Sequence, residues 1–300
     1  YDKGRRRFFS LPNDHHQGDH CMERFENLVL DQERALYGLN GAEVVRCLFE
    51  GPADGESALK EASDITVESC EFRLRYPFWH VRGGKVVNST LTDTCRAALW
   101  YAEDMTIESS TLGGIKALRE CDRMALTGCA VDSAEFGWSV RGMEMADCTV
   151  KGEYFMLRSD HLHFRNVTLK GKYSFQYIEN CVFEDCNFDT KDAFWHAKNV
   201  TVRNSVIKGE YLAWFSEGLT LINCRIIGTQ PLCYCKDLKL IDCTMEDTDL
   251  SFEYSDVQAT VKGHIHSVKN PRSGQITADS VGEVIMEDAV MECTGKVTIR

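Results

Sequence analysis

The chain has 300 residues, of which 43% are hydrophobic and 27% charged, a composition typical of a globular protein with a buried core. Its formal net charge of −12 argues against a nucleic-acid partner, because neutralising phosphates requires a basic surface. No run approaches the roughly 18 consecutive apolar residues that cross a bilayer, so we expect no membrane partner either.

Residues 1–20 are expected to form a flexible or tag-like terminus. The charged start YDKGRRRFFSLPNDHHQGDH lacks the ~7–15-residue apolar core of a secretory signal. Because the chain begins at Tyr1, a signal removed before this residue stays an open alternative. We interpret Arg5, Arg6 and Arg7 as part of a solvated terminus and not as a binding patch.

A repeat of 19 residues follows a segment, 21–41, that departs from any register. Two of the repeats are GMEMADCTVKGEYFMLRSD from Gly142 and NVTVRNSVIKGEYLAWFSE from Asn199. The repeat from Gly83 to Glu103 has 21 residues and therefore carries a two-residue insertion. So short a period, sustained from Ala42 to Gly274, predicts a stack of similar coils.

Three columns of this register are expected to face the core. Two are apolar throughout, as at Leu126 and Val131, and the third accepts small side chains. We expect the cysteines of the third column to be buried, stacked and unbridged: Cys47, Cys70, Cys129, Cys148, Cys186, Cys224 and Cys243.

The apolar residues alternate within each repeat, as in Val200-Thr-Val202, which is the period of a strand. A unit of 19 residues holds two or three short strands, each pairing with its equivalent about 4.8 Å along the axis. The sequence therefore predicts an all-β fold: a right-handed single-stranded parallel β-helix, or β-solenoid, over 42–274, with about 11–12 coils of mostly 19 residues. We expect an N-terminal cap at 21–41 and a C-terminal cap with the last strands at 275–300.

Polar residues precede the small column in most repeats. We interpret them as turn ladders whose side chains hydrogen-bond the turn backbone, in preference to catalytic carboxylates: Asp147, Asn166, Asp185, Asn204, Asn223 and Asp242.

The chain has 14 cysteines, and we expect most of them to be free thiols. So many free thiols favour a reducing compartment, so we expect the protein in the cytoplasm. Alternate spacing places two metal-ligand types on one strand face at Cys233/Cys235, His161/His163 and His264/His266. A zinc site needs three or four converging ligands, and no such motif accompanies these pairs. We therefore predict no metal and no cofactor.

A second strand is expected just before each coil ends, in segments such as FWHV, ALWY and FWHA. One of its columns, here called the tryptophan column, contains all 5 Trp of the chain. The next position forms the histidine column, which runs Glu61, His80, Tyr101, Glu120, Ser139, Arg158, Tyr177, His196, Phe215, Tyr234 and Glu253. A polar strip a few residues upstream contains Arg75, Arg96, Lys172 and Asp192.

Aromatic planes mixed with charged side chains are typical of a saccharide-binding cleft. We predict as catalytic residues His80, Glu120, Arg158, Asp192 and His196. The predicted substrate-binding residues are Arg75, Trp79, Arg96, Trp100, Tyr101, Arg119, Trp138, Lys172, Tyr177, Trp195 and Trp214. Their arginines, or Arg158, would anchor a uronate.

The two histidines are too many coils apart to share one site. A single active site would use either the His80, Tyr101 and Glu120 neighbourhood or the neighbourhood of Arg158, Tyr177 and His196. The alternative interpretation is that these columns are ladders that stabilise the stack.

The segments ERALYGLNGAEVVRCLFEGPADGESALKE, RYPFWH, CRAALWYAEDMTIESS and GKYSFQYIENCVFEDCNFDTKDAFWHAKNVTVRNS are similar to an uncharacterised family of bacterial proteins. That family is a domain of unknown function placed among pectin-lyase-like right-handed β-helices. The resemblance covers roughly Glu33 to Ile285 and implies the fold, but it transfers no activity and no catalytic residue. A secreted pectinase is disfavoured, because no cluster of calcium-binding Asp stands beside a catalytic Arg.

These observations lead to two hypotheses. The first is a cytoplasmic β-helix that binds a saccharide along the Trp, His and Arg face or processes it as a lyase or hydrolase. The alternative is a non-catalytic scaffold that uses the same face for protein interaction. The sequence leaves the oligomeric state open.

Overall fold

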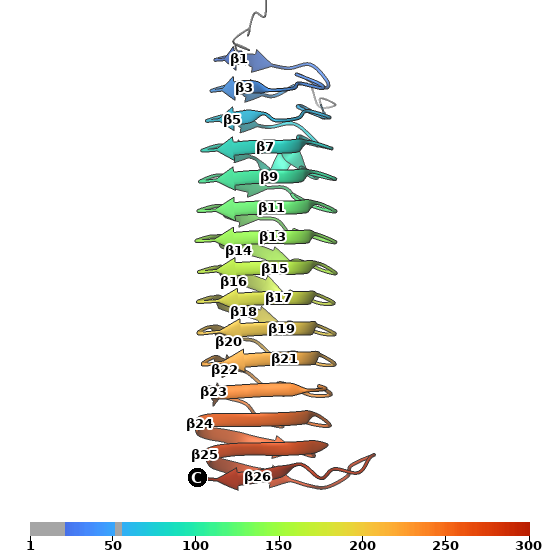
Figure 1. Cartoon of the computed structure of the whole chain (residues 1–300), viewed down its shortest axis with the longest axis vertical. Coiled ribbons are helices and arrows are strands. Elements are labelled where there is room, and N and C mark those ends of the chain that lie inside the picture. The colour runs from blue at the N-terminus through green and yellow to red at the C-terminus, as the bar shows by residue number, and fades with distance from the viewer. Residues whose placement is uncertain (1–21, 52–55) are drawn as a thin grey trace, which may run out of the picture.

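A computed structural model describes residues 22–51 and 56–300; the predicted terminus 1–20, with Arg5, Arg6 and Arg7, lies outside these residues. The chain winds into a β-solenoid of about 14 turns with about 19 residues per turn and almost no helix. The near-side strands run from right to left while the chain descends, which is the sense of a right-handed coil (Figure 1). The predicted fold class is confirmed.

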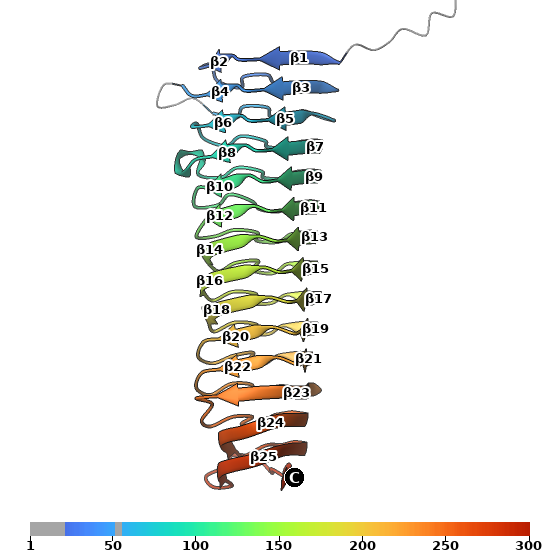
Figure 2. The ribbon, with the colours of Figure 1, turned by 90° about the vertical axis from the view of Figure 1, so that its left-hand side faces the viewer.

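Two stacks of parallel strands make up most of the solenoid, and Figure 2 shows them at opposite sides of the coil. Sheet A contains the first strand of each coil: β1 (Glu23–Glu26), β3 (Ala42–Val45), β5 (Thr66–Glu68), β7 (Arg82–Val87), β9 (Glu103–Glu108), β11 (Asp122–Thr127), β13 (Arg141–Ala146), β15 (Asp160–Arg165), β17 (Glu179–Glu184), β19 (Lys198–Arg203) and β21 (Glu217–Ile222). Sheet B contains the second: β2 (Val29–Leu30), β4 (Leu48–Phe49), β6 (Glu71–Phe72), β8 (Thr90–Leu91), β10 (Thr111–Gly113), β12 (Ala130–Asp132), β14 (Thr149–Glu153), β16 (Thr168–Lys172), β18 (Asn187–Lys191), β20 (Val206–Lys208) and β22 (Arg225–Ile227).

The last coils use longer strands. These are β23 (Leu238–Glu246), β24 (Asp256–Lys269), β25 (Ser273–Ile285) and the short β26 (Lys296–Ile299). A single 3₁₀ turn, η1 (Asp93–Cys95), lies in the coil with the two-residue insertion. Among the described residues no helix is long and apolar enough to cross a membrane.

Strand pairing confirms the 19-residue register. Leu126 of β11 pairs with Met145 of β13, and Lys198 of β19 pairs with Glu217 of β21. Parallel stacking continues beyond the expected 42–274, since β1 pairs with β3 and β25 with β26. The described parts of 21–41 and 275–300 thus add coils of their own, which is why the solenoid exceeds the 11–12 coils expected; a capping role for these segments stays a prediction.

The core contains the predicted columns. Val131 and Leu126 are almost fully buried, and so are their equivalents in other coils. The cysteine column is buried as predicted, and each of its members is a free thiol: Cys47, Cys70, Cys129, Cys148, Cys186, Cys224 and Cys243. Sulfur donors are satisfied by carbonyls, as where the Cys129 thiol donates to Ile107 O at 3.4 Å.

The polar turn ladder forms, although its hydrogen bonds differ from the expected ones. Asn166 donates its amide to the Asp147 carboxylate at 2.7 Å, and Asn223 donates to Asn204 at 2.9 Å. These four side chains therefore bond to one another between coils. Their backbones adopt positive φ, which Asn and Asp tolerate better than most residues.

We expected a second strand just before each coil ends, and this prediction is wrong: the segment is a run of turns. Alternate residues adopt positive φ, for example Tyr154 at 49°, Met156 at 58° and Arg158 at 55°. Their N–H groups point in alternate directions along the axis, because Arg158 donates to Gln176 O in the next coil and Met156 to Phe136 O in the previous one. The segment is thus held by inter-coil hydrogen bonds without strand geometry, and its side chains repeat at one-coil intervals.

Candidate functional site

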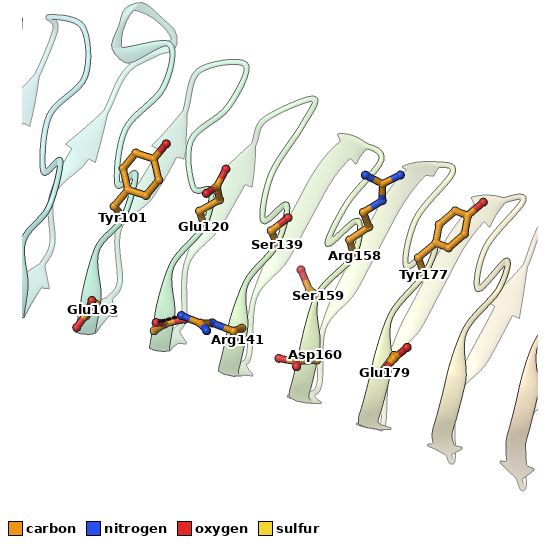
Figure 3. Close-up of a pocket in the computed structure, with 11 residues that line it drawn as sticks. Tyr101, Glu103, Glu120, Ser139, Arg141, Arg158, Ser159, Asp160, Tyr177 and Glu179 are labelled. Carbon is orange, nitrogen blue, oxygen red and sulfur yellow. Dashed lines mark hydrogen bonds and ion pairs between the residues drawn. The ribbon is translucent and has the colours of Figure 1, made fainter.

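A groove of about 570 Å³ opens beside the turn segments of five successive coils. Figure 3 shows two rows of side chains along it. One row belongs to the histidine column and comprises Tyr101, Glu120, Ser139, Arg158 and Tyr177. The other row stands where the strands of sheet A begin and comprises Glu103, Asp122, Arg141, Asp160 and Glu179, with Ser159 between the rows.

The backbone of the turn segment directs the first row outwards. Every residue of this row has φ between 50° and 57°, and each donates its N–H to the next coil, as Glu120 does to Trp138 O at 2.8 Å. Non-glycine residues rarely adopt this conformation, and it persists here because the inter-coil hydrogen bonds hold it. The row therefore repeats one side-chain direction at the spacing of the coils.

Between His80 and Tyr234, aromatic rings stack along the histidine column everywhere except at the groove. His80 stacks on Tyr101 with ring centroids 4.9 Å apart, and Tyr177 stacks on His196 at 4.7 Å. Between the two tyrosines come Glu120, Ser139 and Arg158, none of which has an aromatic ring. The groove thus lies where the ladder is interrupted, and the two tyrosines stand four coils apart, about 19 Å at 4.8 Å per coil.

Both predicted neighbourhoods meet in this one groove. Glu120 comes from the first and Arg158 from the second, and a tyrosine of each marks an end. The histidines do not line the groove. His80 and His196 each stack behind the terminal tyrosine, on the side away from the interruption.

The second row carries most of the formal charge. Arg141 donates to the two Asp122 oxygens at 2.7 and 2.5 Å, and this contact, with a smaller effect of Asp160, raises the pKa of the guanidinium. One oxygen of Asp160 is buried and accepts no hydrogen bond from the described residues, and it lies 3.6 Å from the His161 ring. The column of these residues was missed from the sequence, although its acids recur at Glu103, Asp122, Asp160 and Glu179 with the coil period.

Glu120 and Arg158 differ from most charged side chains of the solenoid. In the described part of the chain neither forms an ion pair, whereas charged residues elsewhere usually pair across coils. Arg158 lies over the Tyr177 ring at 5.8 Å. Both groups are exposed at the groove and available to a ligand.

The tryptophan column is half-buried and its ring faces are largely covered. Trp79 stacks on Trp100 at 5.1 Å and Trp195 on Trp214 at 5.5 Å, one coil apart as the register predicts. Arg119 lies between the Trp100 and Trp138 rings, 5.3 and 4.2 Å from their centroids.

The indole N–H groups mostly close hydrogen bonds within the solenoid. Trp195 donates to Tyr211 O at 2.7 Å, and Trp79, Trp138 and Trp214 make equivalent bonds. Trp100 is the exception, since its N–H is buried without a partner among the described residues. These contacts favour a structural ladder for this column, while its predicted role in binding stays a prediction.

A second cavity of about 430 Å³ opens on the other side of the turn segment, at the coil with the insertion. It brings together three predicted binding residues, Trp79, Arg96 and Trp100, with Tyr76, Ile115, Lys116 and Glu135.

The remaining predicted residues are dispersed. Arg75 lies 3.6 Å from Glu56, Arg119 donates to Glu135 at 2.9 Å and Lys172 lies 3.2 Å from Glu153. Asp192 is buried in the upstream strip, and its burial raises the pKa of its carboxyl.

One of the predicted histidine pairs contacts carboxylates. His163 lies between Glu144 at 3.0 Å and Glu184 at 3.3 Å on the outer surface of sheet A. Within residues 22–51 and 56–300 no group of three His, Cys, Asp or Glu side chains is placed to hold a metal ion.

The fold and the axial groove define a parallel β-helix protein. A family model described as "Protein of unknown function (DUF3737)" matches residues 23–299, and the chain belongs to this family. No curated protein matches the sequence.

Several solved β-helix structures are similar in fold. The Azotobacter vinelandii mannuronan C-5 epimerase AlgE4 A-module is 10% identical over 80% of this chain and 89% of its own, with a TM-score of 0.36. The catalytic domain of a GH87 alpha-1,3-glucanase is 7% identical over 92% of this chain and 63% of its own, with a TM-score of 0.34. Tailspike protein 3 of bacteriophage CBA120 is 10% identical over 92% of this chain and 56% of its own, with a TM-score of 0.31. At these identities the likeness is one of fold alone.

Proposed function

We propose that this protein binds a saccharide along the groove between Tyr101 and Tyr177. The observation that carries the proposal is the interruption of the aromatic ladder. A histidine covers one face of the ring at each end, and on the groove side the column offers Glu120, Ser139 and Arg158, with the Arg158 guanidinium over the Tyr177 ring at 5.8 Å.

The chemistry of the groove supports this ligand class. A saccharide presents apolar ring faces and a rim of hydroxyl groups, so it needs aromatic rings together with charged hydrogen-bond partners. Tyrosine supplies a flat apolar face with a polar tip. Carboxylates such as Glu120 accept hydrogen bonds from hydroxyls and guanidinium groups such as Arg158 donate to them, and bonds to charged groups are the stronger ones.

The experiment is a binding screen with oligosaccharides of differing charge and linkage, followed by calorimetry on the ligands that bind. We expect Arg158→Ala to weaken binding about tenfold, because a charged hydrogen-bond donor is lost. Lys236→Ala, which removes an exposed cation far from the groove, is the matched control and should leave affinity unchanged. Wild-type protein that binds no member of the screen contradicts the proposal.

Turnover is a separate part of the hypothesis. Of the five residues predicted as catalytic, Glu120 and Arg158 line the groove, so we propose that any lyase or hydrolase reaction uses Glu120. Product analysis after prolonged incubation with a bound saccharide tests this. Cleavage that survives Glu120→Gln unchanged would show that the reaction uses another residue.

The exposed ladder favours a second candidate function, a scaffold that binds another protein. Tyr177 and Phe215 are 46% and 44% exposed, and they stack with His196 and Tyr234 into one aromatic strip. Aromatic side chains are frequent hot spots of protein interfaces. A partner whose capture depends on Phe215 but not on Ser139 or Glu120 would support the scaffold.

We also propose a reducing compartment, the cytoplasm. Every cysteine in the described residues is a free thiol, and burial raises the pKa of Cys95, Cys121 and Cys181 to about 12. In native protein with Cys21 replaced by Ser, we expect only the half-buried Cys293 to label rapidly. Intramolecular disulfides in protein isolated from its cells without reductant would overturn this.

A further inference from the structure

The groove carries a clear excess of negative charge. Five carboxylates line it against two guanidinium groups, which leaves three negative charges in excess. On the basis of the proposed function, we infer that the saccharide it takes carries protonated amino groups: a chain of amino sugars whose amines are not acetylated.

Internal pairing neutralises part of this charge but not all of it. Arg141 is bound by both Asp122 oxygens, so this guanidinium is already engaged within the wall. The side chain of Asp122 is only 16% exposed, whereas that of Arg141 is 73% exposed, so the pair lies at the rim. After this pair is set aside, the groove keeps four carboxylates against Arg158.

Two of these carboxylates lack a strong internal cation. Glu120 has no ion-pair partner in the part of the chain that the structure describes; the Asp160 carboxylate lies 3.6 Å from the His161 ring and interacts with Arg141 more weakly than Asp122 does. Glu103 and Glu179 contact Arg123 at 3.5 Å and Lys198 at 3.6 Å, and neither cation lines the groove. An ammonium group placed between the rows would complete the missing charge-assisted hydrogen bonds.

The same charges disfavour an acidic saccharide. Of the arginines predicted to anchor a uronate, Arg75 and Arg119 are paired with glutamates and Arg96 lines the second cavity. Arg158 alone of that set reaches the groove. A cleft lined mainly by one sign of charge concentrates the opposite charge and repels its own, so a uronate would meet Glu120 and Asp160, which lack a strong cation, beside a single arginine anchor.

The test compares three oligosaccharides of equal length by calorimetry: fully deacetylated chitosan hexamer, chitin hexamer with every amine acetylated, and an oligomer of uronic acids. The pH is set so that the chitosan amines are protonated. We expect chitosan to bind about tenfold more tightly than chitin, the uronate to bind most weakly, and only the chitosan affinity to fall steeply with salt.

The variant Glu120→Gln tests whether the Glu120 carboxylate contacts a protonated amine of the saccharide. It should reduce the preference for chitosan over chitin about tenfold and weaken chitin binding much less than chitosan binding, because a carboxamide still accepts hydrogen bonds from hydroxyls but no longer carries the charge that attracts an ammonium group. Glu61→Gln is the control, since Glu61 occupies the same column two coils before the groove begins and is also exposed. The affinity for spermine, a polyamine without a sugar ring, tests whether the groove recognises positive charge alone.

The outcomes separate this inference from the proposed function. Equal binding of chitin and chitosan, or tighter binding of the uronate, overturns the amino-sugar inference and leaves saccharide binding standing. Failure of all three oligomers to bind, in a protein that also binds no other saccharide, overturns both. Spermine binding as tightly as chitosan also overturns the inference, because the groove would then select a polycation and not a sugar.

Discussion

Two stretches of the histidine column share one backbone and differ in what their rings can do. From Tyr177 through His196 and Phe215 to Tyr234, successive rings stack at 4.7, 5.0 and 4.8 Å and are nearly parallel. From Tyr101 to Tyr177 the coils continue without a change of register, but the ladder is interrupted and a groove replaces it. Stacked rings cover each other's faces and present their edges to solvent, so under the proposed function we expect a ring-shaped ligand to bind the column only where the stacking is interrupted.

The largest expected loss of stability follows from removing a ring to which we assign a structural role. Trp195→Ala should lower the free energy of unfolding by about 2–3 kcal/mol, because it removes a stacked, half-buried indole and its bond to Tyr211 O. Chemical denaturation measures this. Saccharide affinity should not change, since Trp195 does not line the groove; a stable variant that has lost binding would assign Trp195 to the site after all.

Continuing the ladder through the groove should abolish binding. Ser139→Tyr places a ring in the middle of the interruption, at a backbone position where Tyr101 and Tyr177 already hold the same φ. We expect affinity to fall at least about a hundredfold, equivalent to ~2.7 kcal/mol, with no loss of melting temperature. Glu61→Tyr adds a ring to the same column outside the groove and should leave titration curves unaltered. Undiminished binding by Ser139→Tyr would place the ligand elsewhere.

A milder test compares two rings of nearly equal exposure. Tyr177→Ala removes the ring at one end of the groove and should weaken saccharide binding about tenfold. Phe215→Ala removes a similarly exposed ring two coils further on, and its affinity should match wild type. Equal losses in the two variants would indicate binding along the whole ladder and not in its gap.

The smallest expected effect concerns Asp192, a predicted catalytic residue that lies outside the groove. Burial raises the pKa of this carboxyl above its ordinary value of 3.8. The folded state therefore favours the protonated form, so the ionised carboxylate destabilises the fold at neutral pH, and this cost disappears as pH falls below 3.8.

Asp192→Asn should accordingly raise the melting temperature by about 1 °C at pH 7 and have no effect at pH 3. The exposed Asp247→Asn serves as control at both pH values. An Asp192→Asn variant that melts lower than wild type at neutral pH would show that the carboxylate is stabilised by contacts and not penalised by burial.

The sequence predicts the core of this fold well because periodicity reports burial directly. Leu126 and Val131 could be assigned to the interior from their columns alone. The turn segment could not be predicted, because non-glycine residues such as Met156 and Arg158 give no local signal for positive φ; the inter-coil hydrogen bonds impose it.

Only one of the two rows of residues that line the groove could be predicted from the sequence. The columns of Glu120 and Arg158 were recognised, yet a period does not say which column stands opposite which across a bend. Asp160 and Arg141 were therefore missed, although they recur with the same spacing. The sequence also could not predict ring stacking, since a column of aromatic residues has the same pattern whether the ring faces cover one another or are exposed.

The constant pairing of each residue with the one 19 positions later makes the molecule modular along its axis. Each coil contacts chiefly its two neighbours, so a whole unit can be removed or duplicated without altering the geometry of the rest. Deleting 199–217 would join Lys198 to Gly218 in the same register and shorten the exposed ladder by one rung, because Glu217 occupies the position equivalent to Lys198. Duplication and loss of such units would let a lineage change the length of the stack while the groove between Tyr101 and Tyr177 is inherited intact.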